Sequence, residues 1–98
     1  AEQFLKQAIH QQPKRAPYWL SLAQVQKGTG QRYEAKQSLE QAIALDNHLA
    51  PAHFELAELL LIDQQAWQAK HHYQQGLAVE PNQISAWINL AQAEIRLE

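Results

Sequence analysis

Several features that mark other classes of protein are missing from this chain of 98 residues. It contains no cysteine, which excludes disulfides, thiolate zinc sites and a cysteine nucleophile together. No apolar run approaches the roughly 18 residues of a membrane helix, and the first residues lack the basic-then-apolar order of a signal peptide. We therefore expect a soluble protein without membrane insertion. Its compartment, cytoplasmic or periplasmic, stays open, because proteins of both can lack cysteine.

Charge is also scarce, at 18% of the residues, and the formal net charge is −2. Without a basic field, the chain is not expected to bind nucleic acid or acidic lipid. Hydrophobic residues make up 46% of the chain, which suffices for a globular core, and 98 residues allow at most one domain.

What the chain does contain is an internal repeat with a period of 34 residues. One such shift superimposes identical residues, among them Ala16 and Ala50, Leu22 and Leu56, Ala23 and Ala57, Ala35 and Ala69, Lys36 and Lys70, Ala44 and Ala78. A second shift aligns Ala52, Leu56 and Ala57 with Ala86, Leu90 and Ala91. Trp19 and Trp87 lie two periods apart, with His53 midway. A repeat array is far more often a binding scaffold than an enzyme.

Within each period, apolar residues recur at helical spacing. Helices are expected over residues 2–11, 17–28, 31–44, 51–62 and 65–78, and from residue 84 onward. Pro13 ends the first helix, and Pro17 suits the first turn of the second, where its missing N–H would have had no partner. After the second helix, Gly30 is available for the left-handed conformation that ends helices. The expected fold class is all-α.

Helix pairs with this period resemble tetratricopeptide repeats. That family's motif has large residues at positions 4, 7 and 24, small residues at 8, 20 and 27, and Pro at 32. The first complete repeat supplies Trp19, Leu22, Ala23, Ala35, Leu39 and Ala42, and the second supplies His53, Leu56, Ala57, Ala69, Tyr73, Gly76 and Pro81.

The resemblance implies a right-handed solenoid of antiparallel helix hairpins, an α-α superhelix formed as one domain over residues 1–98. Its expected parts are the second helix of a preceding repeat (1–15), two complete repeats (16–49 and 50–83) and the first helix of a further repeat (84–98).

The sequence also departs from the family's pattern in places. Asn47 replaces the usual Pro, and His53 is expected to be a partly buried substitute for the tryptophans at the equivalent positions. Gln64 stands where the first repeat has Gly30. If that turn needs a positive φ, Gln64 costs roughly 1 kcal/mol relative to glycine.

The resemblance also implies a concave groove, lined by the first helix of each repeat. Because successive residues are rotated by about 100°, the positions opposite the packing face point into this groove. The candidate peptide-groove residues are Leu20, Ser21, Gln24, Phe54, Glu55, Glu58, Ile62, Ile88, Asn89, Gln92 and Arg96.

Leu20, Phe54 and Ile88 form an apolar line along this predicted groove, and Glu55 with Glu58 would favour a basic ligand residue. The alternative is that the apolar line only supports packing between successive first helices, with both glutamates solvated.

Some members of the family hold the carboxylate tails of chaperones with Lys, Arg and Asn side chains in this groove. Leu20, Gln24, Glu55, Ser85 and Asn89 stand at those positions here. A clamp of that kind is not expected, and Glu55 would repel a carboxylate.

Catalytic and metal-binding patterns are not expected in this sequence. The histidines include no pair at i,i+4, and Gly28-Thr29-Gly30 is too short to cradle phosphate. Glu55 and Glu58 lie on adjacent turns, but an open groove offers little for acid–base catalysis. We expect no catalytic residue, no cofactor and no metal.

Both ends of the chain interrupt a repeat, so it looks like an excised piece. Trp87, Leu90 and the stripe over residues 4–9 would then be partly uncovered, which would allow self-association through the ends of the solenoid.

These patterns predict a protein–protein interaction scaffold that binds a peptide or protein segment in its groove. Two alternatives remain open. One is a regulatory or substrate-presenting segment of a larger enzyme, such as a glycosyltransferase or sulfotransferase. The other is an assembly factor of a bacterial surface or secretion machine.

Overall fold

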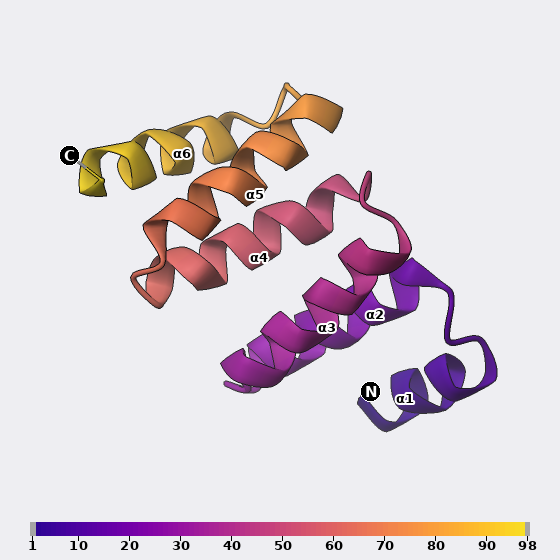
Figure 1. Cartoon of the computed structure of the whole chain (residues 1–98). Coiled ribbons are helices and arrows are strands. Elements are labelled where there is room, and N and C mark those ends of the chain that lie inside the picture. Colours follow the sequence, from indigo (N-terminus) through magenta and orange to yellow (C-terminus); the bar gives the residue numbers. More distant parts are fainter. Residues whose placement is uncertain (1, 98) are drawn as a thin grey trace. The chain divides into compact units, whose positions relative to one another are not determined.

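The computed structural model describes residues 2–97, which form six α-helices and no strand (Figure 1). The helices are α1 (Glu2–Gln11), α2 (Ala16–Gly28), α3 (Arg32–Leu45), α4 (Ala50–Ile62), α5 (Ala66–Val79) and α6 (Ile84–Arg96). The predicted all-α fold is confirmed, with the helix ends within about one residue of those expected from the periodicity. None of these helices has the length and apolar character needed to cross a membrane.

The chain divides into two compact units, Ala1–Asn47 and His48–Glu98. In the first unit, α2 packs against both α1 and α3. In the second, α5 packs against α4 and α6, and α4 also contacts α6. The division into repeats stays a prediction, although the expected starts at residues 16, 50 and 84 coincide with the starts of α2, α4 and α6.

Alanine lets the two helices of each complete repeat approach closely. Ala23 of α2 and Ala35 of α3 are fully buried, and so are their counterparts Ala57 of α4 and Ala69 of α5. Larger side chains fill the space beside them. The buried leucines and aromatic residue at this packing face are Leu22, Leu39, Leu56 and Tyr73. The packing face predicted from the periodicity is therefore confirmed in both hairpins.

The terminal helices differ in part from the prediction. Leu90 of α6 is buried, at 6% exposure, because α6 packs against α5, so the expectation that it would be uncovered is wrong. Ala91 is exposed, and Ala86 and Ala93 are buried in its place. Trp87 is half exposed, as expected. In α1, exposure falls from 76% at Phe4 to 8% at Ile9.

The turn inside each hairpin has the same hydrogen bonds in both repeats. The Gln31 N–H donates to the Gln26 carbonyl at 2.8 Å, and the Gln65 N–H donates to the Leu60 carbonyl at 2.8 Å. This closure requires a left-handed residue just after the helix. Gly30 has φ +79° and Gln64 has φ +65°. Gln64 thus has the positive φ on which its expected cost depends.

A tryptophan secures two of the turns between hairpins. The Trp19 indole Nε1 donates to the Pro13 carbonyl at 3.0 Å, and the Trp87 Nε1 donates to the Pro81 carbonyl at 2.8 Å. In the middle repeat, the residues at the equivalent positions are Asn47 and His53. His53 is buried, at 3% exposure, and its ring turns to His72 of α5.

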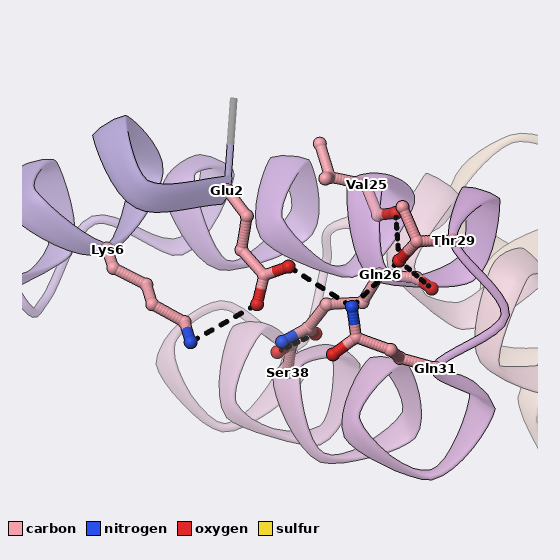
Figure 2. A network of polar contacts seen from close by, with 7 residues as sticks. All are labelled: Glu2, Lys6, Val25, Gln26, Thr29, Gln31 and Ser38. Atoms are coloured by element: carbon pink, nitrogen blue, oxygen red, sulfur yellow. Dashed lines mark hydrogen bonds and ion pairs between the residues drawn. The ribbon is translucent and has the colours of Figure 1, made fainter.

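A polar network joins the three helices of the first unit (Figure 2). The buried Ser38 hydroxyl donates to Gln26 Oε1 at 2.7 Å, which satisfies a glutamine on the packing face. The Gln31 amide donates to Glu2 Oε1 at 3.2 Å, and Lys6 Nζ lies 3.2 Å from Glu2 Oε2. The hydrogen bonds from Lys6 and Gln31 hold the pKa of the Glu2 carboxyl below its usual range. The bond from Gln31 connects α1 to the turn between α2 and α3.

We predict that Gln64→Gly raises the melting temperature, because glycine adopts the left-handed conformation without the steric cost of a Cβ. The expected gain is roughly 1 kcal/mol in the free energy of unfolding. Thermal unfolding followed by circular dichroism measures it. Gly30→Ala, at the same turn position of the first repeat, is the matched control and should lower the melting temperature. An unchanged or lower value for Gln64→Gly would contradict the prediction.

Candidate functional site

The eleven predicted groove residues all lie in the described part of the chain, and none of them is buried. Leu20, Ser21 and Gln24 lie on α2 in the first unit. The other eight lie on α4 and α6 in the second unit, where the two helices are in contact. The predicted set therefore remains a prediction, and its best-defined part is the surface that α4 and α6 share.

A depression of about 220 Å³ lies on this shared surface. Four of the predicted residues line it: Phe54, Glu55, Glu58 and Asn89. A second depression, also of about 220 Å³, continues past Glu58 and Asn89 to Ile62 and Arg96. Ile88 and Gln92 line neither depression, although both are exposed. The structure thus brings together Phe54, the two glutamates and Asn89 of the predicted groove.

Phe54 is held at the depression by a close approach to α5. A Cβ added to Gly76 would lie against its ring, 2.8 Å from Cδ1 and 3.0 Å from Cζ. Gly76 is buried inside a helix, a position where glycine is normally unfavourable. The glycine is therefore explained by the ring that covers it. In the first repeat the equivalent residues are Leu20 and Ala42, a smaller side chain opposite a larger one.

Tyr73 of α5 also lines both depressions, and sequence reasoning placed it only on the packing face. It is 1% exposed, and its hydroxyl has no hydrogen-bond partner among the described residues. Burial raises the pKa of Tyr73 to about 12, and the Glu58 carboxylate acts in the same direction. Asn89 lies close enough to oppose this shift, but the pair lacks the geometry of a hydrogen bond. The phenol therefore stays neutral at physiological pH.

Glu80 was also missed as a site residue. It lies at the C-cap of α5 and lines the first depression together with the two glutamates of α4. Only its position directly before Pro81, in the turn that leads to α6, could have indicated this from the sequence.

Arg96 combines a structural contact with its predicted groove position. Its guanidinium donates to the Leu61 carbonyl at 2.9 Å, which satisfies a backbone acceptor near the end of α4. It thereby connects α6 to α4 and borders the second depression.

Three histidines of the second unit, His53, His71 and His72, form a group that the sequence did not predict. Nδ1 of His53 and Nδ1 of His72 are 3.0 Å apart, so one ring donates to the other. The edge of His71 meets the His72 ring, with centroids 5.2 Å apart. Burial lowers the pKa of His72 to about 4, and His53 and His71 act in the same direction. Within residues 2–97, no group of three or more His, Asp or Glu side chains is arranged to hold a metal ion.

Comparison with known proteins gives the following matches. The family model described as tetratricopeptide repeat matches residues 16–48. No curated protein sequence matches the chain. A thermophilic TPR protein from Thermus thermophilus is 30% identical in sequence with a TM-score of 0.80, over 97% of this chain and 48% of that structure.

Two further structures have the same fold at lower identity. The first TPR of Spaghetti (RPAP3), bound to the HSP90 peptide SRMEEVD, is 20% identical with a TM-score of 0.92, over 99% of this chain and 79% of that one. YrrB, a TPR protein with an unusual peptide-binding site, is 16% identical with a TM-score of 0.89, over 99% of this chain and 50% of that one. The chain thus spans about half the length of two of these three structures.

We predict that Gly76→Ala lowers the melting temperature. Helix propensity favours alanine by about 1 kcal/mol, but overpacking against the Phe54 ring costs about 1–3 kcal/mol. Adding Phe54→Leu recreates the residue pair of the first repeat, so the double variant should melt above Gly76→Ala alone. Gly28→Ala is the control, because nothing lies within 4 Å of the added methyl group. A Gly76→Ala variant as stable as the parent would contradict the close contact.

A second prediction concerns pH. His72 binds a proton less readily in the folded chain, where its pKa is about 4, than in the unfolded chain, where it is near 6.5. The folded chain, which keeps His72 neutral, therefore has its full stability against unfolding above pH 6.5. This stability falls as the pH falls towards 4. The melting temperature should drop between pH 7 and pH 5, and His72→Gln should flatten this dependence. The exposed His10→Gln serves as control and should retain it; equal slopes in both variants would contradict the assignment.

Proposed function

Because this chain is a tetratricopeptide repeat protein, we propose that it is a protein-interaction scaffold without chemistry of its own, which binds a peptide or protein segment in the groove lined by the first helices of its repeats. The surface shared by α4 and α6 is the part of that groove whose geometry is best defined. The observation that carries the proposal is the depression there, which joins an aromatic wall to carboxylate and amide groups.

The chemistry of this surface suits an extended segment. Phe54 and the exposed Ile88 offer apolar contact area, and the Asn89 amide can both donate to and accept from a peptide backbone. The carboxylates favour a segment with basic residues and repel acidic ones. Spaghetti, which shares the fold, was solved with a bound peptide, and YrrB has a peptide-binding site; both support this use of the fold.

A pull-down with a charge-reversed groove tests the proposal. The variant Glu55→Lys/Glu58→Lys changes only partly exposed side chains and leaves Phe54 on Gly76. It should lose at least one partner that the parent chain captures. Circular dichroism must show an unchanged fold.

The matched control is Glu34→Lys/Glu40→Lys, which makes the same change in charge at exposed positions of α3. It should keep the partner. If both double variants keep every partner, the groove of the second unit is not the binding surface.

A further inference from the structure

The first depression has an acidic rim built from two helices. Glu55 and Glu58 come from successive turns of α4, and Glu80 caps the C-terminal end of α5. The C-terminus of a helix adds partial negative charge of its own. Among the described residues that line the depression, none is basic. The potential inside it therefore favours a cation.

Beneath this rim lies a polar atom without a partner. The Tyr73 hydroxyl is buried and forms no hydrogen bond within the described chain, which is costly for a group that can donate one and accept another. Glu58 and Asn89, the two groups that act on its titration, line both depressions. The side chain that carries this unpaired hydroxyl lines both depressions, so the hydroxyl leaves a hydrogen bond for a ligand atom to complete.

We propose that the first depression is a subsite for the side chain of an arginine in the bound segment. The inference rests on the proposed function and names the residue that this part of the groove selects. The guanidinium stacks on the Phe54 ring and donates to the carboxylates of Glu55 and Glu58. One of its N–H groups reaches the oxygen of Tyr73.

Arginine fits this arrangement better than lysine. The acceptors come from α4, α5 and α6 and therefore surround the depression, and a guanidinium presents five donors in one plane where an ammonium presents three from a single atom. The flat cation also stacks on an aromatic ring such as that of Phe54. Tyr73 stays a neutral phenol, so its oxygen can accept a hydrogen bond from the cation.

The test uses three small probes on the 98-residue chain: N-acetylarginine methylamide, its lysine counterpart and its citrulline counterpart. Citrulline has the shape of arginine without the charge. Amide chemical shifts in two-dimensional NMR follow each titration. The arginine probe should give saturable shifts centred on Tyr73, Glu58 and Asn89. The citrulline probe should bind at least about fivefold more weakly, with lysine in between.

Two variants assign the roles of the side chains. Tyr73→Phe removes only the hydroxyl, so it should weaken the arginine probe several-fold while the melting temperature stays equal or rises. A purely structural hydroxyl would give the opposite result, a lower melting temperature with unchanged binding. Glu58→Gln should also weaken the arginine probe, whereas the exposed Glu40→Gln on α3 should not.

The outcomes separate this inference from the proposed function. Equal binding of arginine and citrulline, or no saturable shift with the arginine probe, overturns the arginine subsite. The pull-down with Glu55→Lys/Glu58→Lys would still decide whether the groove captures a partner. Shifts confined to other surfaces, such as the exposed face of α1, would also overturn the inference.

Discussion

The close approach of paired helices is the constraint on which the rest of this structure depends. Alanines at the crossing of each hairpin are fully buried, so the two backbones lie near enough for the flanking leucines to pack from both sides. One repeat cannot bury both faces of its helices, which is why hairpins of this kind stack. The face of α4 opposite this packing is not covered by the hairpin. The residues there, Phe54, Glu55 and Glu58, are only partly buried.

The sequence predicted those features of the fold that depend on local periodicity. The helices, their turns and the positive φ at Gln64 follow from a 34-residue repeat and from one comparison with Gly30. Contacts between distant side chains were not predictable in this way. The pairing of His53 with His72 arises because two departures coincide: histidine replaces the tryptophan that elsewhere reaches the carbonyl of a proline, and His72 occupies the position of Ser38. Neither substitution alone indicates the pair.

The candidate site shows the same limit. Helical geometry predicted Glu55, Glu58 and Asn89, because these positions oppose the packing face of the first helices. It could not add Tyr73 or Glu80, which line the depression from α5 and from its C-cap. A site built by two helices of a hairpin depends on their separation, and that separation is set by the residues buried between them. Arg96 is a further case, because its bond to the Leu61 carbonyl spans 35 positions in the chain.

The contact between Phe54 and Gly76 also constrains how such repeats can diverge after duplication. The first repeat has Leu20 and Ala42 at these positions, and an intermediate sequence must carry one change before the other. Phenylalanine opposite alanine would clash, whereas leucine opposite glycine leaves only a gap and a weaker helix. Whichever of the two residue pairs came first, the intermediate without a clash has leucine at the position of Phe54 and glycine at the position of Gly76. The order of substitutions at this surface is thus set by a methyl group on the neighbouring helix.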